Sequence, residues 1–286
     1  MWQRLIFGIL MGALALCAAE RHEARGIVLK TDAAHDLLVI SCEAIPGYMD
    51  AMEMEFLVQE PKLLFGLKQG MAVNFSIVSH GNELYAEDIS EGTTTNFESE
   101  PMEAGQLTAL NNMLAPAGKQ LATGDRVPDF SLTDQAGATI HLTQFGGKVV
   151  VLTFGYSRCP NPDYCFRLSS NLARVEQRFH SGAGKSFVLM TIMIDPEHDQ
   201  GAILSQYAGA FKADPASWHF LTGAATKIKQ IAAMFGMNFW SVDGLVTHSL
   251  HTVIIDRQGR LAVNLDGNRF TPQELCDLVG TVIDSR

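Results

Sequence analysis

Two cysteines near the middle of the chain have the residue type and spacing for thiolate chemistry. Cys159 and Cys165 are separated by five residues, two of which are prolines that stiffen the loop. Thiolates bind soft metal ions and exchange disulfides, and both reactions need two sulfurs that can approach each other. A disulfide closing so small a loop would add only about 2–3 kcal/mol of stability. A functional pair is therefore favoured over the alternative, a purely structural disulfide.

The residues around this pair predict a strand before the loop and a helix after it. The unbroken apolar run at 149–152 is typical of a strand buried on both faces. Leu168 and Leu172 begin an apolar pattern with helical spacing. Asp163 is the expected N-cap, which places Cys165 in the first helical turn, where free amides and the helix dipole favour a thiolate. Strand, loop with two thiols and helix form the reactive corner of a thioredoxin-type fold.

The rest of the segment 122–286 agrees with an α/β thioredoxin-like domain. Apolar strands are predicted at 187–194 and 218–221, each followed by a helical pattern. A hairpin at 251–265 and a capping box at 271–274 that opens a last helix complete the chain. This alternation with a closing hairpin and helix matches the thioredoxin order.

A histidine is expected beside the two sulfurs. In the thioredoxin order, the first strand of the hairpin runs antiparallel to the strand that carries the cysteines, so its entry loop, 246–250, lies next to them. Redox thioredoxins have a shielding cis-proline in this loop, whereas here the matching position is Leu250 and His248 offers an imidazole. Two sulfurs and one nitrogen make a trigonal set suited to copper. His251 is the reserve candidate if His248 points away.

Four motifs in this domain resemble the Sco/SenC family. They are Gly124-Asp125-Arg126-Val127-Pro128-Asp129-Phe130, Cys159-Pro160 to Cys165, Asp195-Pro196-Glu197-His198-Asp199 and His248-Ser249. The resemblance covers essentially all of 122–286, and it implies a copper site on Cys159, Cys165 and His248. It also implies a role in building the dinuclear copper centre of respiratory oxidases, with an oxidase subunit as partner.

Two features of this resemblance stay open. The common family spacing is Cys-x3-Cys, whereas this chain has Cys-x5-Cys, so the client protein is not fixed by the motif. Asp195 and Asp199 either orient the metal site through hydrogen bonds or simply end a strand and cap the next helix.

The first 19 residues predict an exported protein. Arg4 precedes an apolar run at 5–16 and a small-residue cleavage site at 17–19, the pattern of a secretory signal. An uncleaved anchor or a lipidated Cys17 are the alternatives. The formal charge of −10 argues against nucleic acid or anionic lipid as a partner and agrees with a periplasmic protein, soluble or tethered to the inner membrane.

Residues 22–90 predict a small all-β barrel of the oligonucleotide/oligosaccharide-binding (OB) type. Five short β patterns occur there without a long helix. Met52 and Met54 alternate, so both thioethers project to one face of a strand. Soft sulfur ligands select copper(I) or silver over zinc and calcium. The alternative is that both methionines fill the core.

The stretch 41–54 resembles the copper-binding barrels of the CusF type, and the likeness extends over 26–89. The resemblance implies a second metal site in which Met52 and Met54 are thioether ligands. Cys42 stands where that family has a histidine, and Met49 falls near the aromatic residue that covers the metal. Both positions depart from the family pattern.

These patterns predict four parts: a signal at 1–19, the barrel at 22–90, a polar linker at 91–121 that lets the domains meet or part, and the α/β domain at 122–286.

The working hypothesis is a periplasmic metallochaperone whose barrel captures copper(I) and whose second domain delivers it. The alternatives are a thiol-disulfide oxidoreductase acting through Cys159 and Cys165, and a copper buffer for resistance. A peroxiredoxin is disfavoured because Tyr156 replaces the expected threonine or serine.

Overall fold

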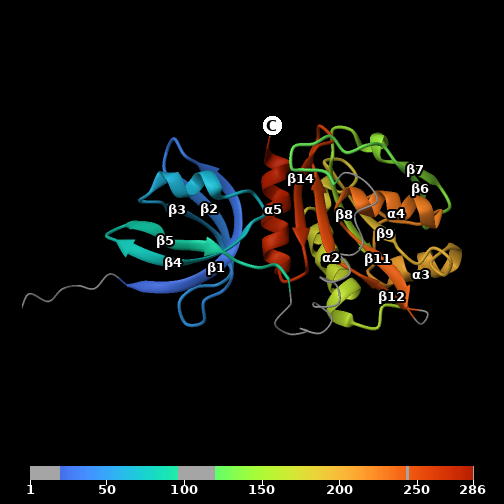
Figure 1. Cartoon of the computed structure of the whole chain (residues 1–286), viewed down its shortest axis with the longest axis horizontal. Coiled ribbons are helices and arrows are strands. Elements are labelled where there is room, and N and C mark those ends of the chain that lie inside the picture. Colours follow the sequence, from blue (N-terminus) through green and yellow to red (C-terminus); the bar gives the residue numbers. More distant parts are fainter. Residues whose placement is uncertain (1–19, 96–119, 243–244, 286) are drawn as a thin grey trace, which may run out of the picture.

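The computed structural model describes residues 20–95, 120–242 and 245–285. Within them the chain forms a β-barrel and an α/β unit, with helix α5 (Pro272–Asp284) between the two (Figure 1). The predicted signal at 1–19 and most of the predicted linker lie outside the described residues. No helix in the described part of the chain is long and apolar enough to cross a membrane.

The barrel closes in the order β1-β2-β3-β5-β4. Its strands are β1 (Arg21–Asp32), β2 (Leu37–Cys42), β3 (Met52–Leu57), β4 (Ala72–His80) and β5 (Glu83–Glu91). The short helix η1 (Pro61–Gly66) follows β3. Alternate residues such as Val28, Leu38 and Phe56 fill the interior, where Phe56 packs edge-on against Phe75. The predicted OB-like barrel is confirmed.

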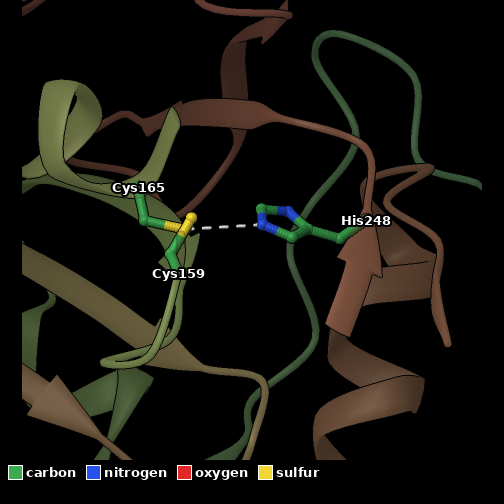
Figure 2. A group of neighbouring side chains, drawn as sticks. All are labelled: Cys159, Cys165 and His248. Carbon is green, nitrogen blue, oxygen red and sulfur yellow. Dashed lines mark hydrogen bonds between the residues drawn. The ribbon is translucent and has the colours of Figure 1, made fainter. Parts of the chain in front are cut away.

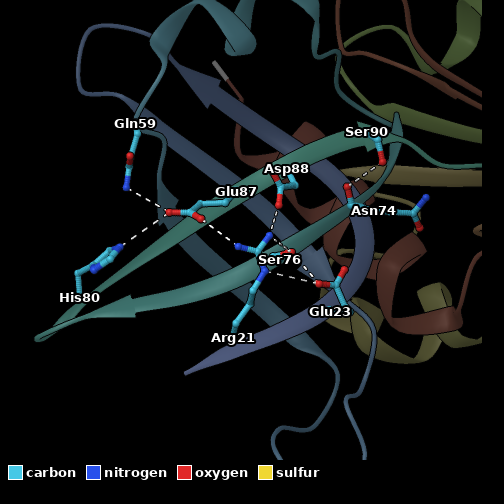
Figure 3. A network of polar contacts seen from close by, with 9 residues as sticks. All are labelled: Arg21, Glu23, Gln59, Asn74, Ser76, His80, Glu87, Asp88 and Ser90. Atoms are coloured by element: carbon cyan, nitrogen blue, oxygen red, sulfur yellow. Dashed lines mark hydrogen bonds and ion pairs between the residues drawn. The ribbon is translucent and has the colours of Figure 1, made fainter. Parts of the chain in front are cut away.

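A polar network covers one outer face of the barrel, over β1, β4 and β5 (Figure 3). Arg21 donates to Glu87 at 3.2 Å and to Ser76 at 2.8 Å, and Ser76 donates in turn to Glu23 at 2.9 Å. The ion pair of Arg21 with Glu87 is partly exposed, and such pairs contribute little stability, so this polar face is not a packing surface. The apolar outer face of the barrel is on β1 and β2.

The α/β unit is built on a five-stranded sheet in the order β10-β9-β8-β13-β14. Its strands are β8 (Val149–Gly155), β9 (Phe187–Met193), β10 (Trp218–Leu221), β13 (His251–Ile255) and β14 (Leu261–Asp266). Strands β8, β9 and β10 are parallel, whereas β13 is antiparallel to β8 and to β14. All seven residues of β8 are buried because helices cover both faces of the sheet. The predicted thioredoxin-like fold is confirmed.

Smaller elements complete this unit. Two hairpins, β6 (Ser131–Thr133) with β7 (Thr139–His141) and β11 (Phe239–Val242) with β12 (Leu245–His248), lie outside the main sheet. The helices are η2 (Leu142–Phe145), η3 (Pro162–Phe166), α2 (Arg167–Arg178), η4 (His180–Gly182), α3 (Gly201–Ala210), α4 (Ala225–Met234) and α5. Helices α2, α3 and α5 contribute to the core on one face of the sheet, and α4 contributes to the core on the other.

The barrel docks against α5 through a shared apolar core. Ile27, Leu29 and Val39 point out of the barrel and join the core that contains Leu275 and Val279 of α5. At about 25 cal/mol per Å² of buried apolar surface, such contacts stabilise the docked arrangement. The barrel therefore shares part of its core with the second unit, so the two domains meet, which is one of the two arrangements that the predicted linker allows.

One buried polar cluster stands inside this interface. The Ser41 hydroxyl of β2 donates to Asp277 of α5 at 2.7 Å, and Arg178 of α2 donates to the same carboxylate at 2.8 Å. The Asp277 side chain is only 1% exposed. Since buried carboxylates need partners, this cluster fixes one register of the barrel on α5.

Glu274 gives a testable pH dependence. It is buried at the start of α5, where its carboxylate accepts from the backbone amide of Thr271 and completes the predicted capping box. Burial raises the pKa of Glu274 to about 7, above its ordinary value. A raised carboxyl pKa means that the folded state holds the proton more tightly, so the free energy of unfolding falls as pH rises from about 4.5 to about 7.

We expect Glu274→Gln, which keeps the capping acceptor without the charge, to be about 2 kcal/mol more stable than wild type at pH 8. At pH 4.5 the two proteins should have nearly equal stability, because Glu274 is then protonated. Urea unfolding at both pH values measures the difference. Equal stability of the two proteins at pH 8 would contradict the raised pKa of Glu274.

Candidate metal centre

The loop between β8 and α2 carries both cysteines. Asn161, and not Asp163 as predicted, is the N-cap: its side chain accepts from the backbone amide of Asp163 at 3.0 Å. An asparagine before a proline at the first helical position is an equally good cap signal, which the prediction overlooked. The π-helical turn η3 then contains Cys165, whose side chain points into the protein and is buried.

The structure brings Cys159, Cys165 and His248 together (Figure 2). Their ligating atoms all lie within 4.8 Å of one another, and Cys165 Sγ is 3.4 Å from His248 Nε2. Cys165 and His248 are buried, whereas Cys159 is partly exposed. Both cysteines are free thiols in this structure. Within the described residues this is the one cluster of three histidine, cysteine or acidic side chains with such spacing.

The His248 ring is held with one nitrogen toward the sulfurs. His248 is the last residue of strand β12, and the predicted entry loop is therefore partly a strand paired with β11. Its Nδ1 lies 2.8 Å from the carbonyl oxygen of Ser249. Because a carbonyl only accepts, Nδ1 carries the proton and Nε2 presents its lone pair to the cysteines. The Tyr156 ring packs edge-on at 5.8 Å and limits rotation of the imidazole.

The two thiols have opposite pKa shifts. The pKa of Cys159 is lowered, chiefly because the Cys165 thiol donates a hydrogen bond to its sulfur. The pKa of Cys165 is raised, because it supplies that hydrogen and because it is buried. The reduced pair therefore holds one thiolate and one thiol, and the thiolate is the partly exposed sulfur.

Two aspartates hold the cysteine loop from the neighbouring segment. Asp199 is fully buried and accepts from the backbone amide of Ser157 at 3.0 Å and from the Ser157 hydroxyl. Asp195 accepts from Arg158 Nε at 3.1 Å. Asp199 does not cap the next helix, since α3 follows Gln200 and lacks a side-chain cap. Of the two roles that the sequence left open for Asp195 and Asp199, these hydrogen bonds favour the one in which they orient the metal site.

The predicted barrel ligands share the inner face of the barrel. Cys42 of β2 lies directly opposite Met52 of β3, and Met54 is next on the same face. Cys42 is fully buried, whereas Met52 is 48% exposed and Met54 packs partly against the barrel core. Met49 also packs against this core, and its backbone bridges back to Ile45. Burial and the nearby Glu274 and Asp277 raise the pKa of Cys42 to about 12.

An aromatic residue next to Met49 in the sequence, Tyr48, was missed in the prediction. The Tyr48 ring is 40% exposed and stacks on the His22 ring at 3.6 Å. The prediction named Met49 at the position of a covering aromatic residue, and the neighbouring Tyr48 was the available signal.

Neither the reserve candidate His251 nor the remaining cysteine of the α/β unit, Cys276, joins the metal centre. His251 turns toward β14, where its Nδ1 lies 3.0 Å from the side-chain oxygen of Asn264. Cys276 is buried in α5, and burial raises its pKa to about 11. Asn268, fully buried beside the cysteine loop, was not identified from the sequence.

A thioredoxin-like fold with two thiols and an imidazole at the ends of strands β8 and β13 defines a class of thiol proteins with a metal-binding donor set. The SCO1/SenC family model matches residues 118–284, more than half of the chain, and the chain belongs to this family. A second family model, described as copper binding periplasmic protein CusF, matches residues 21–101.

Individual relatives agree with this assignment. Protein sco1 of Schizosaccharomyces pombe is 27% identical over 167 residues, which are 55% of this chain and 60% of that protein. The mitochondrial SCO2 homolog of Bos taurus is 28% identical over 148 residues, 49% of this chain and 53% of that protein. The chain thus spans a little over half the length of these relatives.

Solved structures agree at the level of fold. A SCO1/SenC family lipoprotein from Bacillus anthracis str. Ames has a TM-score of 0.50 at 22% identity, covering 56% of this chain and 95% of that one. BsSco, described as a member of the Sco family of cytochrome c oxidase assembly proteins, has a TM-score of 0.50 at 19% identity, with coverages of 59% and 99%.

Proposed function

We propose that the chain is a copper metallochaperone that binds copper(I) on Cys159, Cys165 and His248. The observation that carries the proposal is the convergence of two sulfurs and one imidazole nitrogen within 4.8 Å. Two soft thiolates and a neutral imidazole suit copper(I) in trigonal geometry. The partly exposed Cys159 leaves a path by which an incoming ligand can replace one sulfur at a time.

The barrel is the proposed capture site. The thioethers of Met52, Met54 and Met49 would bind copper(I), with Cys42 as a buried sulfur directly opposite Met52. The match to the CusF family and the exposure of Met52 support this role. Since the pKa of Cys42 is raised to about 12, its thiol gives up a proton only on metal binding, and the thioethers are the first contacts.

The proposed recipient is a copper-receiving subunit of a respiratory oxidase. Membership of the SCO1/SenC family supports this, as BsSco is described as belonging to a family of oxidase assembly proteins. The proposed location is the periplasm, in agreement with the predicted signal and with the description of CusF as periplasmic.

A second candidate function is thiol-disulfide exchange on a client protein. The lowered pKa of Cys159 beside the thiol of Cys165 favours it, because a thiolate attacks a disulfide and a neighbouring thiol resolves the mixed disulfide. The same two residues serve both reactions, so only a measurement of transfer separates them.

The test is copper transfer to an apo dicopper domain of an oxidase subunit. The copper(I)-loaded wild type should fill the acceptor, and the Cys159→Ser/Cys165→Ser variant should not. The His248→Ala variant distinguishes the candidates: we expect it to lose transfer while it still reduces a model disulfide. If His248→Ala transferred copper as well as wild type, the redox function would replace the proposal.

Asp199 gives a further prediction for this site. Its replacement by alanine leaves the amide and hydroxyl of the partly buried Ser157 without their acceptor and loosens the loop ahead of Cys159. We expect copper(I) affinity to fall by about 10–100-fold, the usual cost of losing an outer hydrogen-bond partner. Asp195→Ala, which removes only the contact with the exposed Arg158, is the control with a smaller effect. Competition with a chromogenic copper(I) chelator measures both.

A further inference from the structure

The segment Asp266–Phe270, between β14 and α5, contacts the cysteine loop. Asn268 is fully buried, and its side-chain amide donates to the backbone carbonyl of Asp163, within the loop that joins the two cysteines. Arg167 at the start of α2 reaches the carbonyl of Phe270 at 3.5 Å. Segment 266–270 therefore contacts the loop and the helix on which Cys165 depends.

The same segment contacts the strand region that carries the histidine. The backbone amide of Gly267 donates to the carbonyl of Leu250 at 2.7 Å, two residues after His248. Gly267 has a φ of +88°, a conformation that favours glycine. Adjacent residues of one short segment thus hold the cysteine side and the histidine side of the metal centre.

The stretch that follows barrel strand β5, at Thr93 and Thr94, also contacts this segment. The backbone amide of Arg269 donates to the carbonyl of Thr94 at 2.8 Å, and the Thr94 hydroxyl donates to the carbonyl of Asp266. A Cβ atom at Gly267 would lie 2.2 Å from the Thr94 carbonyl oxygen, so the two backbones are in direct contact. Arg25 of β1 donates to the carbonyl of Thr93 and reaches that of Arg269 at 3.5 Å.

We propose that segment 266–270 is a positioning element through which the docked barrel sets the spacing between the cysteine loop and His248. Asn268 is the positioning residue on the cysteine side. Thr94 follows barrel strand β5 and adjoins the Thr93 carbonyl that Arg25 of β1 holds, so it is the contact that links the barrel to this support. The proposal adds an interdomain linkage to the proposed copper function. By reciprocity, metal binding on the two cysteines and His248 would stabilise barrel docking by the same free energy that docking adds to metal affinity.

The metal-free reduced protein provides the first test, through alkylation of individual cysteines followed by mass spectrometry. Cys165 is buried beneath the loop that Asn268 holds, and Cys42 and Cys276 are buried thiols elsewhere in the chain. In Asn268→Ala the alkylation of Cys165 should become about tenfold faster while Cys42 and Cys276 keep their wild-type rates, because only the local loop opens. Faster alkylation of all three would indicate global unfolding and would overturn the positioning role, as would an unchanged rate at Cys165.

Asn268→Asp separates the hydrogen bond from packing. Aspartate has nearly the shape of asparagine but its carboxylate cannot donate to the Asp163 carbonyl. We expect it to behave like the alanine variant. Wild-type protection of Cys165 in Asn268→Asp would show that the side chain only fills space.

Thr94→Val tests the barrel contact and keeps the proposal falsifiable if Asn268 variants fail to fold. It removes one hydroxyl from the interface. We expect the alkylation of Cys165 to become about two- to threefold faster and the copper(I) affinity to fall. Arg260→Ala, which removes a hydrogen bond to Gly124 far from this segment, is the matched control and should change neither. If Thr94→Val equals wild type in both measurements, the barrel does not support the site. The alkylation readout requires no metal, so it can fail or succeed independently of the copper proposal.

Discussion

Replacing Cys165 with alanine is expected to lower copper(I) affinity by more than about 100-fold, more than the loss of an outer hydrogen-bond partner costs. Cys165 is the deepest of the three candidate ligands, and its sulfur is the one that lies 3.4 Å from His248 Nε2. Alanine leaves two donors, which cannot complete a trigonal set. Chelator competition under anaerobic conditions gives the affinity, and an unchanged value would exclude Cys165 as a ligand.

The copper(I) affinity of the wild-type site should also depend on pH. Since the pKa of Cys159 is lowered and that of Cys165 is raised, the metal-free site at neutral pH holds one proton, on Cys165. Binding of copper(I) as a dithiolate complex releases that proton, so affinity should rise about tenfold per pH unit between pH 6 and 8. In Cys165→Ala the slope should remain, because Cys159 loses the Cys165 hydrogen bond that lowers its pKa and its own thiol must then release a proton. A pH-independent wild-type affinity would mean that copper binds without deprotonating Cys165.

The centre of the site was predictable because short-range patterns and fold order both determine it. The apolar run of β8, the two cysteines and the helical spacing of Leu168 and Leu172 are local signals. The position of His248 followed from the antiparallel partner of β8, which the thioredoxin order supplies. The caps were less predictable, since Asn161 and Asp163 are both good N-cap residues two positions apart.

The support around the site was not predictable, because it depends on contacts between segments distant in sequence. Asn268 meets Asp163 across 105 residues, and no periodicity marks a buried asparagine after a strand. The docking of the barrel did leave a signal that the prediction did not use. Ile27, Val28 and Leu29 are consecutive apolar residues, whereas a barrel strand with a hydrated outer face alternates. Such a run indicates that something covers the outside of β1, which in this chain is α5.

The contact between the barrel and helix α5 is expected to be most sensitive to mutation at Asp277. Its carboxylate accepts from Ser41 of the barrel and from Arg178 of α2. Asp277→Ala leaves the fully buried Ser41 hydroxyl unpaired and opens a cavity at the interface. We expect a loss of about 3 kcal/mol in the free energy of unfolding, since breaking a buried pair costs 3–5 kcal/mol and Arg178 is 42% exposed and can rehydrate.

Urea unfolding followed by fluorescence of the buried Trp218 measures this loss. Asp284→Ala, an exposed carboxylate on the same helix, is the matched control and should stay within about 0.5 kcal/mol of wild type. The Ser41→Ala/Asp277→Ala pair then assigns the effect to the interface. If the hydroxyl and carboxylate act together, the double variant loses less than the sum of the single losses, because the second mutation removes a group that has already lost its partner. Strict additivity would mean that the barrel contact contributes nothing, and that Asp277 acts only through its contacts with Arg178 and Gln273.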